Sequence, residues 1–246
     1  MEILKWEDVS FAYDGQFGIK RLSHGLEEGD FTLFFGPNGA GKTTLFRLAA
    51  GLLKPEGGEV FLSGKLLNEW QTLEVAKRVA YLEQEIQYSF PFTVEEIVLM
   101  GRFPHTASQF WDRKEDFETA VWAMETTGVL RFAKRSIFQL SGGERRKVEI
   151  ARALCQKPKL MLLDEPGTFL DLRQQVELFE MLARLNREEN ISIGLISHQV
   201  MLARHYVKSS VFLNEGQIQE CGAPGQLLTD ARVSKFFGIA STKIFK

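Results

Sequence analysis

The fold is decided by nine residues, Gly36-Pro37-Asn38-Gly39-Ala40-Gly41-Lys42-Thr43-Thr44. They match the phosphate-binding loop pattern G-x-x-x-x-G-K-[ST], whose glycines let the backbone turn tightly so that several N–H groups point at one place. The apolar run Phe31–Phe35 precedes the loop, as a buried strand would, and residues 45–50 follow it with a helix-forming composition that stops at Gly51. The N-terminus of that helix adds partial positive charge, so the stretch predicts a polyphosphate ligand.

The composition is that of a globular protein with a sizeable core. The chain has 246 residues, of which 44% are hydrophobic, and this size suits one large α/β domain or a domain with an insertion. The net charge of −2 gives no broad basic surface, so we expect no nucleic-acid partner. We see neither a secretory signal nor an apolar stretch near the roughly 18 residues of a membrane span, and expect a soluble cytosolic chain. Cys155 and Cys221 are expected to be unpaired.

Short apolar strands alternate with helical stretches along most of the chain. The strands are predicted at residues 9–13, 58–62, 79–82, 160–163, 191–196 and 210–213. Asp171 is predicted to cap a helix that carries Leu172, Val176, Phe179 and Leu182. This alternation predicts an α/β fold with a mostly parallel sheet covered on both faces.

The pattern between about residues 86 and 150 is helical instead. Thr93 and Glu96 form a capping box at the start of one predicted helix. A second helix is predicted from Trp111-Asp112 to Thr127, with Phe117, Val121 and Met124 on one stripe and Gly128 as the stop. This segment therefore looks like an insertion into the α/β core.

Two carboxylates follow the apolar run Leu160–Leu163. A buried strand would fix Asp164 at the carboxyl edge of the sheet, where ligands bind in open α/β folds, and Asp164 could hold Mg²⁺ through water. Glu165 is then placed to orient and deprotonate an attacking water. An Asp-Glu pair alone would be read as an exposed turn, but four apolar residues before it and a phosphate loop elsewhere favour the catalytic interpretation.

A second anion site is predicted at Leu140-Ser141-Gly142-Gly143-Glu144-Arg145-Arg146-Lys147. Ser141 and Glu144 form a capping box, which by itself indicates only a well-capped helix. The two glycines after the cap are poor helix formers, and they make sense if a ligand must approach the backbone N–H groups closely.

With these motifs in order, the chain resembles the nucleotide-binding subunit of an ATP-binding cassette (ABC) transporter over nearly its whole length. The stretch Leu140–Glu144 matches the signature that separates this family from other phosphate-loop NTPases. The resemblance implies a single ABC ATPase domain over residues 1–246: an ABC-type P-loop NTPase core, an N-terminal antiparallel β subdomain and an inserted α-helical subdomain. The core and the antiparallel part would occupy 1–85 and 151–246, and the helical part with the signature would occupy approximately 86–150.

The resemblance also implies ATP hydrolysis with Mg²⁺ by two such chains paired head to tail, most simply as a homodimer. ATP would be bound by Gly36, Pro37, Asn38, Gly39, Ala40, Gly41, Lys42, Thr43 and Thr44 of one chain and capped by Ser141, Gly142, Gly143 and Glu144 of the other. Lys42 would reach the β- and γ-phosphates. The metal ligands would be Thr43, Gln84 and Asp164, and the catalytic residues Lys42, Glu165 and His198, with His198 at the γ-phosphate. Tyr13 would stack on adenine, and Gln84 would also sense the membrane partner.

Three positions depart from the family pattern. Gly167 stands where threonine is usual, Phe169 is bulkier than its counterparts, and Gln199 follows His198 where aspartate is usual. None of them removes a predicted phosphate, Mg²⁺ or base ligand.

The stretch Phe92–His105 bears on the class of cargo. Its ending, Gly101-Arg102-Phe103-Pro104-His105, is similar to the segment after the Gln loop in bacterial importers of iron-siderophores, haem and cobalamin. The resemblance implies an importer ATPase on the cytoplasmic face of the membrane, bound to polytopic permease subunits. Two alternatives stay open: a soluble ABC ATPase of a cytosolic assembly system, such as iron–sulfur cluster assembly, and the ATPase of an exporter or lipid transporter.

Overall fold

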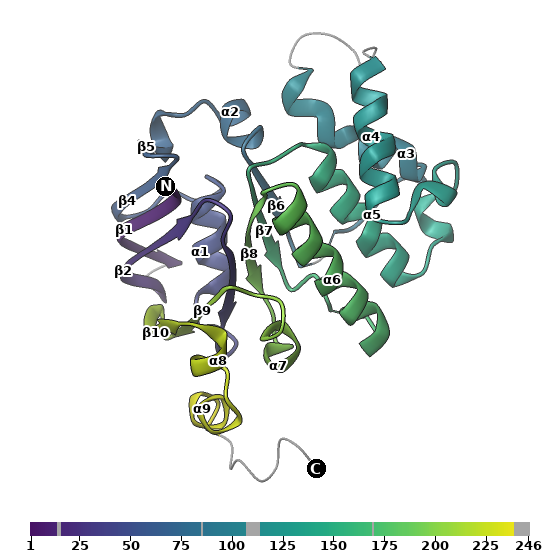
Figure 1. Cartoon of the computed structure of the whole chain (residues 1–246). Coiled ribbons are helices and arrows are strands. Elements are labelled where there is room, and N and C mark those ends of the chain that lie inside the picture. The colour runs from purple at the N-terminus through teal and green to yellow at the C-terminus, as the bar shows by residue number, and fades with distance from the viewer. Residues whose placement is uncertain (14–15, 85, 107–113, 169, 239–246) are drawn as a thin grey trace.

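The structure, a computed structural model, describes residues 1–13, 16–84, 86–106, 114–168 and 170–238. Two β-sheets lie side by side, and the larger one is flanked by helices on the side away from the smaller one (Figure 1). Among the described residues, no helix combines the length and the apolarity that a bilayer crossing requires.

The larger sheet has six strands in the order β10-β9-β3-β8-β7-β6. All neighbours pair in parallel except β10 with β9, so the predicted mostly parallel sheet is confirmed. In chain order the strands are β3 (Phe31–Phe35), β6 (Val79–Leu82), β7 (Leu160–Asp164), β8 (Ser192–Ile196), β9 (Ser209–Asn214) and β10 (Gln217–Gly222). β3, β7 and β8 are buried at every residue, which is why their sequences are continuous apolar runs.

The smaller sheet is antiparallel and comes from the N-terminal part of the chain. Its order is β2-β1-β4-β5, from β1 (Glu2–Tyr13), β2 (Gln16–Glu27), β4 (Gly57–Leu62) and β5 (Lys65–Leu66). A 3₁₀ turn η1 (Leu67–Glu69) and α2 (Thr72–Ala76) lead from it to β6. The antiparallel part of the predicted fold is therefore present.

One core fills the space between the two sheets around α1 (Lys42–Ala49). Leu160 and Leu162 of β7 face this core, because successive side chains of a strand point to opposite faces. Phe46 of α1 comes so close to β8 that a Cβ on Gly194 would lie 3.2 Å from its ring. The glycine thus permits the close helix–sheet packing that fixes where α1 begins.

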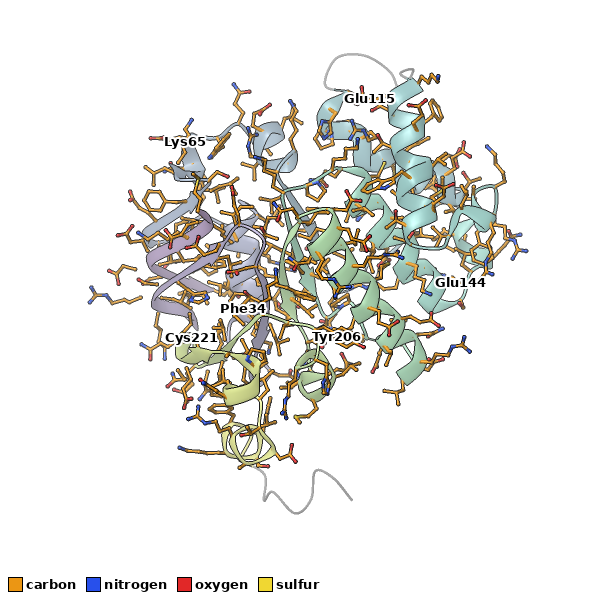
Figure 2. All side chains as sticks on the ribbon, viewed as in Figure 1. Phe34, Lys65, Glu115, Glu144, Tyr206 and Cys221 are labelled. Carbon is orange, nitrogen blue, oxygen red and sulfur yellow. The ribbon has the colours of Figure 1, made fainter. Side chains whose placement is uncertain are left out.

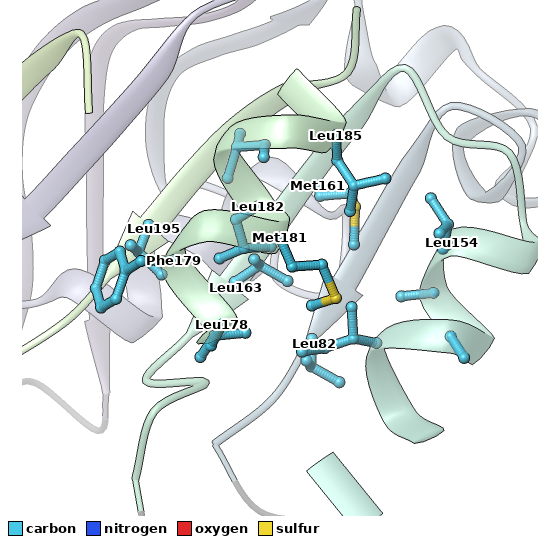
Figure 3. Close-up of a cluster of buried hydrophobic side chains, with 14 of the residues drawn as sticks. Leu82, Leu154, Met161, Leu163, Leu178, Phe179, Met181, Leu182, Leu185 and Leu195 are labelled. Atoms are coloured by element: carbon cyan, nitrogen blue, oxygen red, sulfur yellow. The ribbon is translucent and has the colours of Figure 1, made fainter. Parts of the chain in front are cut away.

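A second core covers the opposite face of the large sheet (Figure 3). Met161 and Leu163 of β7 point into it, and α5 (Gly142–Cys155) and α6 (Leu172–Glu188) pack on them. Asp171 caps α6 and accepts a hydrogen bond from the Gln174 N–H at 2.8 Å, as predicted. Burying each large apolar side chain of this kind is worth about 1.5–3 kcal/mol.

The helical segment consists of short elements, of which the first three pack on α5. In chain order the elements are α3 (Val94–Leu99), η2 (Met100–His105), α4 (Lys114–Thr126), η3 (Leu130–Phe132) and η4 (Ile137–Gln139). The predicted capping box of Thr93 and Glu96 is confirmed. Residues 111–113, where the second helix was predicted to begin, lie outside the described residues. The division of the chain at residues 86 and 150 stays a prediction, and α5 itself continues to Cys155.

Three apolar positions are more exposed than their pattern suggested. Of the stripe predicted on α4, Met124 is buried, but Phe117 and Val121 are 42% and 41% exposed, because the buried face of α4 is formed by the smaller Thr119, Ala120 and Ala123. Leu172, at the first turn of α6, is likewise exposed.

The Gly-Arg-aromatic-Pro-His ending, residues 101–105, packs against the C-terminal end of α5. A Cβ on Gly101 would overlap the carbonyl oxygen of Arg152. The buried Arg102 guanidinium donates to Oδ1 of Asp116 on α4 at 2.8 Å and to the Cys155 carbonyl at 3.0 Å. His105 makes a 2.9 Å bond to the Gln156 carbonyl. Most of this motif is therefore structural, and Phe103, which is 64% exposed, is its outward-facing residue.

The chain continues beyond β8 through α7 (Val200–Ala203), the hairpin β9–β10, α8 (Pro224–Leu227) and α9 (Asp230–Phe236). Phe236 of α9 stacks on Phe212 of β9 with ring centroids 4.1 Å apart, so α9 is held to the large sheet. α7 is a single turn of four residues.

Candidate functional site

The phosphate-binding loop connects the end of β3 to the start of α1. Gly41 is the N-cap of α1 with φ 97°, a left-handed conformation that glycine adopts readily, and no side chain caps this helix. A Cβ on Gly36 would overlap the carbonyl oxygen of Leu213, and one on Gly41 would meet that of Gly18. The loop is thus shaped by its glycines, and the first N–H groups of α1 are left free of side-chain caps, as an anion site requires.

Lys42 is buried at the first position of α1. Its ammonium donates to the carbonyls of Gly36 and Pro37, both at 2.9 Å, so the side chain lies back along the inside of the loop. Burial lowers the pKa of Lys42, and the nearby carboxylates of Glu165 and Asp164 oppose that shift. A cation is therefore held where the loop N–H groups converge.

Thr43 connects the loop to the end of β7. Its hydroxyl donates to Oδ2 of Asp164 at 2.6 Å. Asp164 is buried, and burial raises its pKa while the Thr43 hydrogen bond opposes the shift. Two hard oxygen ligands therefore face one another beside the loop, which is the donor chemistry that Mg²⁺ prefers.

Glu165 follows β7 in a left-handed conformation, with φ 47°. For a residue with a long side chain this conformation is strained, and it turns the carboxylate toward three polar neighbours. Oε1 lies 2.8 Å from Nε2 of His198, and Oε2 accepts from Nε2 of Gln84 at 3.2 Å and from the Thr168 hydroxyl at 3.3 Å. The structure thus brings together the predicted base, the predicted γ-phosphate residue and the predicted Gln-loop residue.

Arg146 reaches the same edge of the sheet from α5, and none of the sequence motifs predicted a role for it. Its buried guanidinium donates to the carbonyls of Glu83 at 2.9 Å, Asp164 at 3.1 Å and Pro166 at 3.2 Å. It also pairs with Glu149 at 2.7 Å. A second arginine directly after a capped helix start was a usable signal, but sequence alone does not tell a buried arginine from a solvated one.

The signature stretch lies at the N-terminus of α5, where Ser141 and Glu144 form the predicted capping box. The Ser141 hydroxyl accepts from the Glu144 N–H at 3.3 Å and donates to its carboxylate at 2.8 Å. Ser141 and Gly142 are exposed, and Gly143 is covered by Gln174. Glu144 lies well away from Phe34, which sits in β3 just before the phosphate loop (Figure 2). One chain therefore does not close its own signature over its own loop.

The remaining predicted residues are arranged as follows. Tyr13 ends β1 with 43% of its surface exposed and its ring 4.8 Å from that of Phe11, so one face of the loop region carries an accessible aromatic. Asn38 and Gly39 are exposed at the tip of the loop, and Ala40 and Thr44 are buried beneath it. The nucleotide, metal and catalytic roles of all these residues stay predictions.

Two of the three departures from the family pattern are neighbours. A Cβ on Gly167 would lie 3.1 Å from Oε1 of Gln199, an oxygen that is held in place by the Ser197 hydroxyl at 2.7 Å. The long side chain at 199 therefore occupies the space that a larger residue at 167 needs, and the two substitutions fit one another. Phe169 lies outside the described residues.

Comparison with known proteins identifies the family. The family model described as ABC transporter matches residues 19–168. The ferric enterobactin transport ATP-binding protein FepC of Escherichia coli (strain K12) is 36% identical over 236 residues, which cover 96% of this chain and 87% of FepC.

Solved structures show the same fold. An inward-facing ABC transporter assigned to the metal-chelate type contains a chain that matches with a TM-score of 0.83 and 28% identity, over 96% of this chain and 89% of that one. The dimeric, post-hydrolysis ATP-binding cassette MJ0796, bound to ADP and Pi, matches with a TM-score of 0.79 and 25% identity, over 90% of this chain and 98% of that one.

Proposed function

This chain belongs to the ABC transporter family, and we propose on that basis that it powers a membrane importer for metal chelates, namely iron-siderophores, haem or cobalamin. It is an ATPase whose fold binds ATP. Ferric siderophores, haem and cobalamin share a metal held in an organic chelator, and the two relatives described above are a ferric enterobactin transport subunit and a protein of the metal-chelate type. We place the chain on the cytoplasmic face of the membrane, bound to polytopic permease subunits.

The phosphate loop supplies the binding energy for ATP in this proposal. The backbone N–H groups of Gly39, Gly41 and the first turn of α1 donate to the β- and γ-phosphates, with the partial charge of the helix N-terminus behind them. Lys42, which rests on the loop carbonyls, exchanges those contacts for phosphate oxygens. Tyr13, exposed at the end of β1, stacks on the adenine.

Thr43 and Asp164 fit a magnesium ion, because their facing oxygens are of the hard type that Mg²⁺ takes up beside phosphate. We propose that they hold Mg²⁺, with Gln84 as a further ligand. When bound, the ion offsets the charge of the phosphate oxygens.

The proposed hydrolytic step rests on one observation. The Glu165 carboxylate is held at the carboxyl edge of the sheet by Gln84, Thr168 and His198. Its carboxylate accepts a proton from the attacking water, and the water oxygen then forms a bond to the γ-phosphorus as the bond to the ADP oxygen breaks. His198 contacts the γ-phosphate and holds the carboxylate in line.

Two chains are needed for turnover in this proposal, since the signature of one chain lies away from its own loop. The N-terminal turn of α5, with Ser141, Gly142 and Gly143, covers the γ-phosphate bound to the partner protomer. ATP then has a higher affinity for the closed pair than for the open one, and this difference drives closure. A dimeric structure similar to this chain supports the arrangement.

Exposed aromatic side chains in the segment after Gln84 support a protein partner. Phe90 and Phe103 are each 64% exposed and Phe92 is 36% exposed. Large exposed apolar side chains are typical of a protein interface. The similarity to a ferric enterobactin transport subunit favours a membrane permease as that partner over a cytosolic assembly system.

The base assignment is tested with Glu165→Gln. We expect this variant to bind ATP as the unaltered chain does and to lose about 10²–10⁴-fold in hydrolysis, which is what a general base contributes. Arg232→Met, which removes an ion pair with Glu220 on β10, is the control and should hydrolyse ATP normally. A Glu165→Gln variant with an unaltered turnover number means that another group is the base.

The transport role is tested by capture from detergent-solubilised membranes. Tagged Glu165→Gln with Mg-ATP should retain a polytopic membrane protein, and the pair in vesicles should show ATPase activity that rises with a ferric siderophore, haem or cobalamin and its binding protein. Recovery of soluble scaffold proteins alone would instead assign the chain to a cytosolic assembly machine. Stimulation by a lipid would assign it to an exporter or lipid transporter.

A further inference from the structure

Arg146 donates hydrogen bonds to the backbone on both sides of Glu165 and to the backbone just before Gln84. Within the described part of the chain, it is the one side chain that we find making this set of contacts. Four of the five guanidinium N–H bonds are accounted for by carbonyls of Glu83, Asp164 and Pro166 and by the carboxylate of Glu149. The side chain is 6% exposed, so these contacts are shielded from water. Two separate segments, the one after β6 and the one at the end of β7, are thereby tied to the first turns of α5.

The contacts on Asp164 and Pro166 bear directly on the conformation of Glu165. A left-handed glutamate persists only where the surrounding structure over-determines it. From one side, the Glu165 N–H is held by the Ile196 carbonyl at 3.0 Å. From the other, Arg146 fixes the peptide groups before and after Glu165. Without these hydrogen bonds from Arg146, the backbone at Glu165 is free to relax and to move the carboxylate away from His198 and Gln84.

The hydrogen bond from Arg146 to the Glu83 carbonyl constrains the backbone next to Gln84 in the same way. Because Arg146 holds the Glu83 carbonyl and the Pro166 carbonyl with one rigid planar group, the residues that follow Glu83 and precede Pro166 are kept in register. Those residues are Gln84 and Glu165, whose side chains meet at 3.2 Å. A lysine cannot replace this fork, since its three donors radiate from a single nitrogen.

We propose that Arg146 is a positioning residue that holds the catalytic carboxylate of Glu165 and the amide of Gln84 at their working separation. It acts through the backbone and touches neither nucleotide nor metal. This inference rests on the proposed function, in which Glu165 is the base. Arg146 also connects α5 to the hydrolytic residues of the same chain through its hydrogen bonds to their backbone. The signature lies at the start of α5.

The test is a double-mutant cycle between Arg146 and Glu165, measured by single-turnover hydrolysis of labelled ATP. Arg146→Lys keeps the charge beside Glu149 and should lower kcat about 10–10²-fold, the scale of a displacement of about 1 Å at a reacting group, while KM changes by less than about threefold. In a Glu165→Gln background the same substitution should lower kcat by less than about twofold, because the carboxylate that it positions is already gone.

A charge-balanced variant guards against a folding defect. Arg146→Met with Glu149→Met removes both members of the buried pair, so neither is stranded as an unpaired charge. It should show the same pattern as Arg146→Lys, and Arg232→Met, which removes an ion pair with Glu220 on β10, should leave kcat and KM unchanged.

An equal loss of kcat in both backgrounds, or a KM for ATP that rises while kcat stays constant, would overturn the inference. Those results differ from a failure of the proposed function, which would show as a Glu165→Gln variant with full activity and would remove the inference with it.

Discussion

Gly142→Ala separates what the chain needs for folding from what the closed dimer needs. Gly142 is the first residue of α5, it is exposed, and no atom would lie within 4 Å of a Cβ built on it. Its backbone is not left-handed. Within one chain, therefore, alanine fits this position without strain.

The stability of the variant follows from these facts. Glycine inside a helix costs roughly 0.5–1 kcal/mol relative to alanine, and a first-turn residue should lie at the lower end, at about 0.5 kcal/mol. For a chain of this size that is an increase in Tm of about 1–2 °C. In the proposed dimer, by contrast, the added methyl group would stand where the γ-phosphate of the partner approaches, and losing a backbone donor to developing charge costs about 10²–10³-fold in kcat.

The assay compares thermal unfolding with steady-state ATPase activity, and adds size-exclusion chromatography of Gly142→Ala in a Glu165→Gln background with ATP. We expect a slightly raised Tm, a loss of activity of about 10²-fold and no ATP-dependent dimer. Gly225→Ala is the matched control, since Gly225 is also in a first helical turn with no atom within 4 Å, and it should gain stability and keep full activity. If Gly142→Ala hydrolyses ATP as well as this control, no nucleotide approaches that helix start.

Three further variants test other parts of the structure. Lys42→Ala should abolish nucleotide binding, read as a loss of fluorescent ATP-analogue binding, while thermal unfolding shows that the chain is folded. Arg102→Ala should destabilise the chain by about 3–5 kcal/mol because it leaves Asp116 buried and unpaired, whereas Arg102→Met with Asp116→Leu should recover most of that loss in chemical denaturation. Gly167→Thr should lower Tm by crowding Gln199, and Gln199→Asp should restore it; additive effects of the two substitutions would contradict the fit between these residues.

Patterns with a fixed physical meaning allowed reliable sequence predictions. The run Leu160–Leu163 is a fully buried strand because it has neighbours on both edges and cores on both faces. The caps at Thr93, Ser141 and Asp171 are all present, since a capping box is local and needs no tertiary information.

What the sequence could not supply is which polar or apolar side chains the tertiary packing selects. Phe117 and Val121 were indistinguishable from core residues, yet Thr119 and Ala120 are buried in their place because α4 approaches α5 closely through small residues. Arg146 and Arg102 are buried because each of them donates to a backbone carbonyl and pairs with a carboxylate. The carbonyl partners come from distant segments, and no periodicity shows them, although Glu149 lies only three residues after Arg146.

The separation of the signature from the phosphate loop within one chain has a genetic consequence. A chain with Lys42→Ala has a defective loop and a sound signature, while a chain with Gly142→Ala has the reverse. When both are made in one cell, each mixed pair contains one site assembled entirely from defective halves and one assembled entirely from sound halves. The two alleles should therefore complement one another when they are expressed together. Either allele expressed by itself should not support growth on the transported nutrient.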